Sequence, residues 1–219
     1  MPDTLSGGAV VPTLYTQISD DIVHGRLGVH DRLSENALSQ RYGVSRTPIR
    51  EALTRLEQDG MIVRQGAMAR IRVRSHEEVN DIYRARTWLE QAIAEDAANR
   101  RGETDILRLR AAWEREDRLD PLTSSPDELM VANRGFHAAL AAASHNATLE
   151  DLQAKLTLQV VQLPATTLGV PGRWEAAHEQ HRKLIDSVEN RDAASAGAIA
   201  RSHLDQARKL RLKLQQDLL

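Results

Sequence analysis

The apolar residues in the first third of the chain recur at helical spacing in three short segments. Each segment is bounded by residue types that start or stop helices: the first covers Leu14–Val23, the second lies between Ser34 and Gly43, and the third runs from Ser45 to Asp59-Gly60. Serine favours a helix start through its hydroxyl, and glycine favours a helix end because it tolerates positive φ. The pattern therefore predicts three short helices.

Two short segments with strand character follow. Residues 61–63 are apolar, and residues 70–73 alternate between charged and apolar side chains, with Gly66 in the turn between the two segments. A hairpin directly after three short helices is the layout of a winged helix-turn-helix domain. We expect this domain to occupy residues 1–75, with residues 1–11 as a flexible tail.

Helical periodicity fills the remainder of the chain. Six segments show it, separated by glycine, proline or asparagine: 77–99, 103–119, 126–144, 147–163, 173–189 and 192–219. Short connections bring successive helices together antiparallel. We therefore expect a mainly α protein, in which the winged helix-turn-helix domain is followed by a C-terminal antiparallel all-α bundle of six or seven helices over residues 76–219.

The composition excludes several kinds of site. Cysteine is absent, which rules out a disulfide framework, a thiolate zinc site and a cysteine nucleophile. No stretch approaches 18 consecutive apolar residues, and the start of the chain lacks the basic and apolar segments of a signal peptide. We expect a soluble cytoplasmic protein that does not contact a membrane.

Charge is distributed unevenly between the two predicted domains. The chain has 29 Lys+Arg and 31 Asp+Glu, a formal charge of −2, yet residues 1–75 hold ten arginines against eight acids. In the third predicted helix, Arg46, Thr47 and Arg50 lie in the first turns, where an arginine can donate two hydrogen bonds to a guanine edge. Arg32 and Arg70 are placed to contact phosphates. Spacing alone leaves open that the helices are only a packing motif with scattered arginines.

The second and third helices carry a long and specific run of residues. It reads Leu33-Ser34-Glu35, Leu38, Tyr42-Gly43-Val44-Ser45-Arg46-Thr47-Pro48-Ile49-Arg50-Glu51-Ala52-Leu53, Leu56-Glu57 and Gly60. This run resembles the DNA-binding signature of the GntR family of bacterial transcription regulators, except that Val29-His30 stands where the family usually has Pro-Gly. The resemblance implies that Arg32, Arg46, Thr47 and Arg50 contact DNA, with the Gly66 turn as the wing tip. With Ser45 and Arg70 they make up the predicted DNA-binding residues.

Three histidines of the predicted bundle have apolar neighbours at helical spacing. His181 and His203 lie in the buried stripes of two different helices, and His137 shares a helical face with Asn133. A single buried histidine is usually a hydrogen-bonded core residue. Three inward-facing imidazoles with an oxygen donor also suit zinc, nickel or a similar divalent ion. Periodicity alone leaves both interpretations open.

A second set of residues spans most of the predicted bundle: Tyr83, Arg86, Leu89-Glu90, Asn133, Phe136-His137, Asn146, Leu149, His181 and His203-Leu204. It resembles the FCD domain, the ligand-binding domain of the FadR subfamily of GntR regulators. The resemblance implies that His137, His181 and His203 bind a divalent metal, with Asn133 where aspartate is common. It also makes Arg86 a candidate partner for an effector carboxylate, and a salt bridge from Arg86 to Glu90 is an equal alternative.

The two resemblances together predict a transcription regulator rather than an enzyme. We expect a homodimer on two-fold operator DNA, acting as a repressor that is released by a small organic acid bound near the metal. One alternative is a metal-dependent hydrolytic enzyme, but no carboxylate is clearly placed as its general base and the DNA reader would be unexplained. Another is a constitutive DNA-binding protein whose metal is structural. Release of DNA by a ligand separates the regulator from the constitutive protein.

Overall fold

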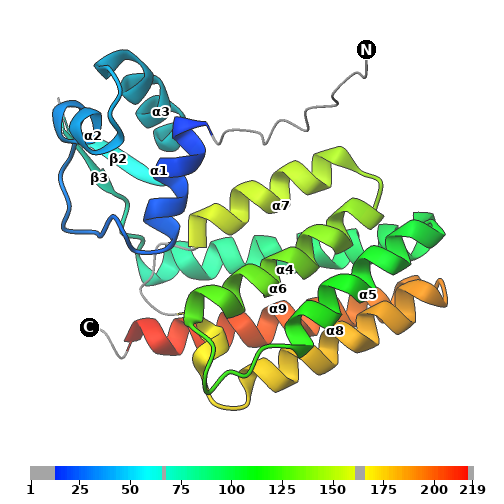
Figure 1. The fold of residues 1–219 in the computed structure, drawn as a ribbon. Coiled ribbons are helices and arrows are strands. Elements are labelled where there is room, and N and C mark those ends of the chain that lie inside the picture. Colours follow the sequence, from blue (N-terminus) through cyan, green and yellow to red (C-terminus); the bar gives the residue numbers. More distant parts are fainter. Residues whose placement is uncertain (1–12, 66–67, 161–165, 217–219) are drawn as a thin grey trace, which may run out of the picture. The chain divides into compact units, whose positions relative to one another are not determined.

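The computed structural model describes residues 13–65, 68–160 and 166–216, and contacts within the chain divide it into two compact units (Figure 1). The first unit ends at Arg72 and the second begins at Val73. The tail expected at residues 1–11 and the wing tip expected at Gly66 lie outside the described residues.

The first unit contains the three predicted helices. They are α1 (Leu14–Val23), α2 (Glu35–Tyr42) and α3 (Arg46–Gln58). Ser34 starts α2 by accepting a hydrogen bond from the Ala37 amide at 3.2 Å, and Gly43 ends it with a φ of 68°. A side chain would strain this left-handed backbone, so glycine is the suitable residue. The helices bury a set of apolar residues that forms the core of the unit: Ile18, Ile22, Leu33, Leu38, Ile49, Leu53, Leu56 and Met61.

The sheet of the first unit has, within the described residues, one strand more than the sequence pattern predicted. β2 (Ile62–Gln65) and β3 (Met68–Ile71) form the hairpin, and β1 (Leu33–Ser34) pairs antiparallel with β3, which gives the order β1-β3-β2. Both hairpin strands lie closer to the turn than the predicted segments, because cross-strand pairing decides where a strand ends. A strand of two residues is too short to show an alternating pattern, so β1 could not be predicted.

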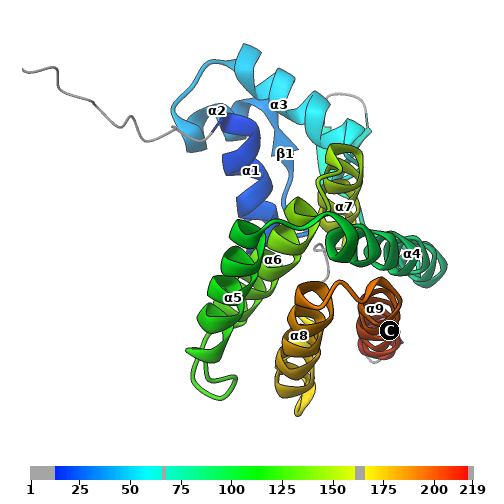
Figure 2. The same ribbon diagram turned by 90° about the vertical axis from the view of Figure 1, so that its right-hand side faces the viewer.

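The second unit is an antiparallel helical bundle, seen from the side in Figure 1 and nearly end-on in Figure 2. All six predicted helical segments are present, with a short 3₁₀ helix before the fifth: α4 (His76–Arg100), α5 (Glu103–Asp117), α6 (Pro126–Ala143), α7 (Ala147–Val160), η1 (Thr167–Gly169), α8 (Arg173–Glu189) and α9 (Ala193–Gln216). The long helix α9 runs back along α4 and also packs against α8.

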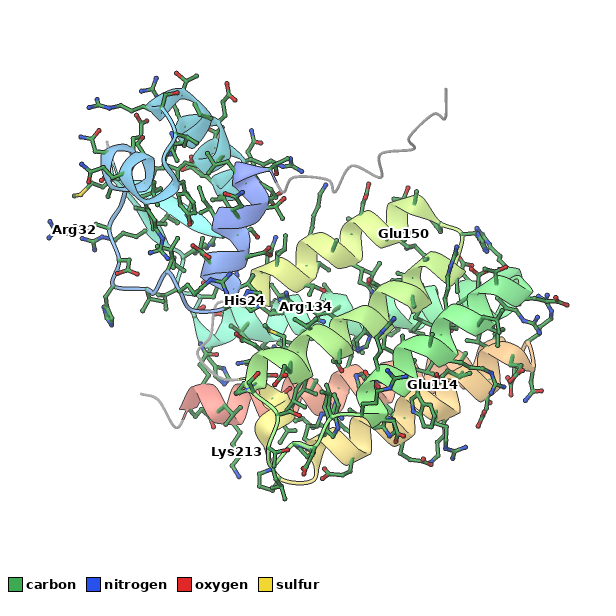
Figure 3. All side chains as sticks on the ribbon, in the orientation of Figure 1. His24, Arg32, Glu114, Arg134, Glu150 and Lys213 are labelled. Atoms are coloured by element: carbon green, nitrogen blue, oxygen red, sulfur yellow. The ribbon has the colours of Figure 1, made fainter. Side chains whose placement is uncertain are left out.

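Local signals in the sequence fix the starts of the longer helices. Ser75 and Ser125 open α4 and α6, and each forms a capping box with the glutamate three residues later. Charged side chains such as Glu114 and Lys213 extend from the outer faces of the bundle (Figure 3). Among the described residues, no helix is long and apolar enough to cross a membrane.

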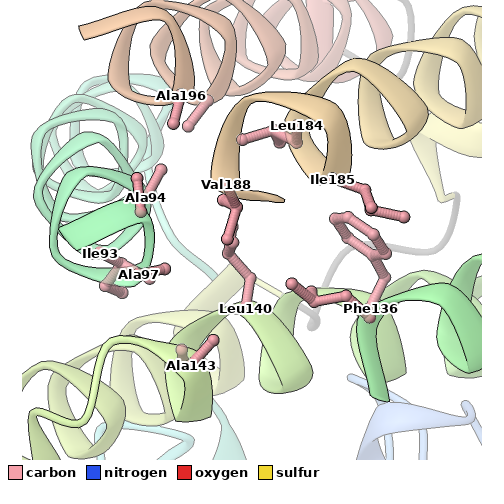
Figure 4. Packing of buried hydrophobic residues seen from close by; sticks show 14 of the residues in the cluster. Ile93, Ala94, Ala97, Phe136, Leu140, Ala143, Leu184, Ile185, Val188 and Ala196 are labelled. Atoms are coloured by element: carbon pink, nitrogen blue, oxygen red, sulfur yellow. The ribbon is translucent and has the colours of Figure 1, made fainter. Parts of the chain in front are cut away.

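The core of the bundle lies between α4, α6, α8 and α9. Figure 4 shows the buried side chains that meet there, among them Ile93, Ala94, Ala97, Phe136, Leu140, Leu184, Ile185, Val188 and Ala196. Small residues let α9 approach α4 closely: at Gly197, an added Cβ would lie 2.5 Å from a carboxylate oxygen of Glu95. This packing holds the inner faces of α6, α8 and α9 in fixed positions.

Candidate functional site

The N-terminal end of α3 presents its predicted DNA-contacting residues to solvent. Ser45, Arg46, Thr47 and Arg50 are all exposed, whereas Ile49 of the same turn is buried. Ser45 has the backbone conformation of an N-cap (φ −70°, ψ 169°), but its side chain makes no capping hydrogen bond. The predicted capping role of this hydroxyl is therefore wrong. The helix start nevertheless retains the amide groups and positive end that favour a phosphate.

Arg50 is paired with a carboxylate in this structure. Its Nε and Nη2 donate to Glu35 Oε1 and Oε2 at 2.8 and 2.9 Å, a bidentate arrangement. The hydrogen bonds from Arg50 lower the pKa of Glu35, so this carboxyl group is ionised at neutral pH. Base contact by Arg50 would therefore require DNA to displace Glu35. Arg46 forms no ion pair with a described residue and influences Glu35 through its charge.

Arg32 and Arg70 lie next to each other across the β1–β3 pair. Leu33 pairs with Ala69 in the antiparallel register, and each arginine directly adjoins one member of that pair. Because Leu33 and Ala69 are buried and side chains alternate along a strand, both arginines project to the solvent side. Both are exposed, and Figure 3 labels Arg32. Together with the start of α3, they form the exposed basic surface of the first unit.

Three histidines from three helices meet in the interior of the bundle. His137 belongs to α6, His181 to α8 and His203 to α9. Their ring centroids are 5.2 Å (His137–His181), 5.1 Å (His137–His203) and 4.8 Å (His181–His203) apart. One nitrogen from each ring lies within 4.8 Å of those from the other two. The three rings thus share one site and are not separate core residues.

An oxygen atom lies at Nδ1 of each of these rings. The pairs are His181 with Glu116 Oε2 at 2.8 Å, His203 with Gln180 Oε1 at 2.9 Å and His137 with Glu90 Oε2 at 3.3 Å. An Nδ1–H that donates to such an oxygen leaves Nε2 unprotonated, which is the form that binds a metal. Glu116 and Gln180 were not predicted as partners, because no local pattern links them to the histidines they contact.

Two buried polar atoms at this site have no hydrogen-bond partner among the described residues. They are Nε2 of His181 and Oδ1 of Asn133, which precedes His137 by one helical turn. A buried polar atom without a partner costs roughly 1–3 kcal/mol. Imidazole nitrogens and an amide oxygen are donors that zinc or nickel accepts. The three imidazoles therefore fit a divalent ion, and Asn133 stays the predicted fourth donor.

Burial determines the protonation of the histidine site. It lowers the pKa of His181 and of His203 well below the ordinary histidine range, so both rings are neutral at pH 7. Burial also raises the pKa of Glu116 to about 7. It acts in the same direction on Glu90, but the interactions of Glu90 with His137, Arg86 and Gln153 together outweigh it and lower the pKa of Glu90. A neutral ring with an oxygen acceptor at Nδ1 is the state that metal binding requires.

Arginines lie beside the histidines. The guanidinium of Arg86 is 5.2 Å from the centroid of the Tyr83 ring, and its Nε has no hydrogen-bond partner among the described residues. Arg86 acts on Glu90 through its charge, and no hydrogen bond between the two is found in the described part of the chain. Arg173 is 4% exposed, and its Nη2 lies 3.5 Å from His203 Nδ1. Arg173 was not among the predicted site residues, although its place on the buried stripe eight residues before His181 was a usable signal.

Comparison with known sequences matches both units to described families. The family "FCD domain" matches residues 81–206, and the family "Bacterial regulatory proteins, gntR family" matches residues 12–69. The chain is 30% identical to the Uxu operon regulator of Haemophilus influenzae, over 90% of this chain and 81% of that protein. It is 28% identical to the transcriptional repressor GlaR of Escherichia coli, over 87% of this chain and 90% of that protein.

Comparison with solved structures supports the same fold. The Escherichia coli protein McbR/YncC superposes with a TM-score of 0.78, covering 94% of this chain and 100% of that chain. The two sequences are 20% identical, so this likeness concerns the fold alone.

Proposed function

The chain belongs to the FCD-domain group of the GntR family of bacterial transcription regulators, and from this we propose that it is a repressor controlled by a metal and an organic acid. As a member of this family it is a DNA-binding regulator and not an enzyme. In the proposal, the first unit binds operator DNA in the cytoplasm through Arg32, Arg46, Thr47 and Arg50. The bundle holds zinc or nickel at His137, His181, His203 and Asn133.

The construction of the histidine site is the observation that carries the proposal. Three imidazoles from three helices bring nitrogens within 4.8 Å of one another, and each ring has an oxygen at its Nδ1. Packing alone does not require a cluster of imidazoles, since apolar side chains of similar volume would fill the space without desolvating polar groups. A bound ion supplies a positive charge that attracts a carboxylate. Arg86, half-buried on α4, is placed to donate hydrogen bonds to the same acid.

Control of DNA binding requires that the acid bind the DNA-competent and DNA-incompetent states with different affinities. The four donors come from α6, α8 and α9, so an ion with its acid favours one arrangement of these helices. We favour repression because GlaR, a relative over most of the chain, is named a transcriptional repressor.

We also propose that the working form is a homodimer. One winged head reads few base pairs, and two-fold operators match two-fold proteins. Large apolar side chains remain on the surface of the bundle, among them Trp88, Leu107 and Val131 at 57%, 67% and 56% exposed, and offer area for a contact. Sedimentation at micromolar concentration is expected to show a dimer. Monomer alone, with and without DNA, would contradict this part of the proposal.

The test measures metal content, DNA affinity and acid response in the same protein. A DNA fragment is selected from random-sequence DNA with the full chain, and its affinity is then measured with zinc and a panel of organic acids. The wild type is expected to bind one zinc per chain and to release the fragment when a fitting acid is added. His181→Ala is expected to lose zinc and the acid response but keep its DNA affinity, because the basic surface belongs to the other unit.

His145→Asn is the matched control. The His145 side chain is 53% exposed and pairs with Asp105, away from the histidine site. Its φ of 46° is tolerated by asparagine, so the control should fold normally. It is expected to keep zinc and the acid response. Retention of zinc by His181→Ala, or loss of the response in both variants, would refute the proposed metal control.

A further inference from the structure

The imidazoles of the histidine site differ in the group that lies at Nδ1. Nδ1 of His181 faces the carboxylate of Glu116 at 2.8 Å, whereas Nδ1 of His203 faces the amide oxygen of Gln180 at 2.9 Å. The same Gln180 oxygen lies 3.3 Å from Nη1 of Arg173. A neutral amide therefore stands between an imidazole and a guanidinium on this side of the site.

The hydrogen bonds of Arg173 are long, although its side chain is buried at the start of α8. Nη1 lies 3.3 Å from Gln180 Oε1 and Nη2 lies 3.4 Å from the carbonyl oxygen of His203, beyond the roughly 2.7–3.2 Å of ordinary N–H···O bonds. Nη2 is also 3.5 Å from His203 Nδ1, but in the metal-binding form this nitrogen carries the proton that it donates to Gln180, so it cannot accept another. Nε has no partner among the described residues. The guanidinium therefore keeps donors for a ligand.

The charge of Arg173 also lacks a carboxylate partner. The polar contacts of its guanidinium with described residues are to the amide of Gln180 and to His203. The phenol of Tyr83 acts on Arg173 through charge but is itself hydrogen-bonded with other arginines, and burial lowers the pKa of Arg173. A buried guanidinium is stable only when an anion or several good hydrogen bonds compensate it. Arg173 is therefore suited to bind an anion.

Arg86, the other arginine beside the histidines, has a different environment. It is half-buried and hydrogen-bonds with Tyr83. Its charge also helps to lower the pKa of Glu90, so an ionised carboxylate of the chain lies near it. Arg173 has no such group among the described residues. Of the two arginines, Arg173 therefore gains more from an external anion.

We propose that Arg173 binds the carboxylate of the effector beside the histidine site, and that Gln180 keeps Arg173 free to do so. This inference rests on the proposed function and specifies the residue that recognises the acid. A carboxylate matches the planar pair of donors that a guanidinium offers. A carboxylate in place of the Gln180 amide would pair with Arg173 permanently. The neutral amide instead accepts the Nδ1–H of His203 and leaves the guanidinium for an external anion.

The first test compares acids with their uncharged amides: acetate with acetamide, L-lactate with L-lactamide, and benzoate with benzamide. Calorimetry measures their affinities for the zinc-loaded full chain. At least one acid is expected to bind at least about tenfold more tightly than its amide. Arg173→Gln is expected to weaken the tightest-binding acid by at least about tenfold and to retain zinc. Arg115→Gln, which replaces an exposed arginine of α5, is expected to bind that acid like the wild type.

Gln180→Glu tests the same contact without removing the arginine. The introduced carboxylate is expected to occupy the donors of Arg173, so the affinity for the acid should fall by at least about tenfold. Zinc binding should persist, because a carboxylate also accepts the Nδ1–H of His203. Gln206→Glu makes the same chemical change at an exposed residue of α9 and is expected to keep the acid affinity of the wild type.

Thermal unfolding without acid gives a readout that does not depend on the ligand. Gln180→Glu is expected to raise the Tm, because its carboxylate compensates the buried charge of Arg173, whereas Gln206→Glu should leave the Tm unchanged. A lower Tm in Gln180→Glu would overturn the proposal. So would an acid affinity within about twofold of the wild type in Arg173→Gln or Gln180→Glu. Loss of zinc together with the acid in Arg173→Gln would make Arg173 a structural residue and would also overturn it.

The two proposals fail in different ways. If zinc binds and an acid releases DNA from Arg173→Gln as well as from the wild type, the inference about Arg173 is wrong and the proposed function stands. The same holds if Arg86→Gln, and not Arg173→Gln, loses the acid. If zinc does not bind, or no acid changes the DNA affinity of the wild type, the proposed function itself is wrong.

Discussion

The candidate functional side chains of the two units differ in their exposure to solvent. In the first unit, Arg32, Arg46 and Arg70 are exposed to solvent. In the bundle, His181 and Arg173 are 0% and 4% exposed, and contacts from other helices fix their positions. An exposed charge contributes little to folding, whereas a buried polar group must be compensated within the fold.

This difference determines whether a substitution changes function and stability separately or together. In our proposal DNA supplies the partners of the exposed arginines, so their substitution should alter DNA affinity and leave stability unchanged. In the bundle, one set of contacts both packs the core and aligns the ring nitrogens. Substitutions there should change stability and metal binding together.

The largest expected effect tests this coupling in the bundle. Phe136 is fully buried and stacks on His181 with ring centroids 3.9 Å apart. Phe136→Ala removes core contacts and the support of that imidazole, and is expected to lower the free energy of unfolding by about 3–5 kcal/mol. Zinc affinity should fall with it. Denaturant unfolding and zinc titration measure the two quantities.

Leu152→Ala is the control for this experiment. Leu152 is a 44% exposed residue of the same unit, and its truncation should change stability by less than about 0.5 kcal/mol. Phe136→Ala could instead be destabilised and still bind zinc with wild-type affinity. Packing and metal binding would then be separable, which would contradict their proposed coupling in the bundle.

The second prediction concerns the contribution of individual arginines of the basic surface to DNA affinity. Arg46→Ala is expected to weaken binding to the selected DNA by about 1–3 kcal/mol, with an unchanged free energy of unfolding. Arg50→Ala should cost less, because Glu35 competes for Arg50, and Glu35→Gln should tighten binding by removing that competition. Fluorescence anisotropy measures the affinities. Equal losses in the two arginine variants, with no gain in Glu35→Gln, would show that Glu35 does not compete.

Arg70→Ala provides the matched comparison for Arg46→Ala. A phosphate contact lowers affinity for all sequences by a similar factor, whereas a base contact changes sequence preference. Arg70→Ala is therefore expected to keep the preference of the wild type. A relaxed preference in this variant would place Arg70 at a base.

The smallest expected effect concerns pH. Burial raises the pKa of Glu116 to about 7, and the ionised carboxylate is a stronger acceptor than the protonated acid for the Nδ1–H of a metal-bound His181. Zinc affinity is therefore expected to fall about tenfold as the pH drops from 8 to 6. Glu116→Gln should bind zinc more weakly at pH 8 and show a shallower pH dependence. An identical slope in the two proteins would exclude Glu116 as the titrating group.

The stability of the zinc-free protein is a second measurement, and its expected dependence on pH has the opposite sign to that of zinc affinity. An acid whose pKa is raised by folding favours its protonated form in the folded state. The stability that Glu116 contributes is therefore present below its unfolded pKa of about 4.5 and is lost as the pH rises through about 7. Unfolding in the presence of a chelator, compared between wild type and Glu116→Gln, measures this contribution.

Much of the architecture could be predicted from local features of the sequence. Apolar spacing and boundary residues such as Ser34 and Gly43 placed the helices, because a helix depends on contacts within a few residues. The same spacing predicted that His181 and His203 face inward, and both are buried. The short strand β1 and the ends of the hairpin strands could not be predicted, because pairing with a distant segment decides them.

The sequence by itself determined the helices, the family and the inward direction of His181 and His203. Only the tertiary structure decided that the three imidazoles meet, that Glu116 lies behind His181, 65 residues away, and that Glu35 holds Arg50. It also brought Arg173 to His203. The physical reason is that helical periodicity fixes the direction of a side chain relative to its own helix. The distance between side chains of different helices depends on how the helices pack, and this follows from the shape of the whole core.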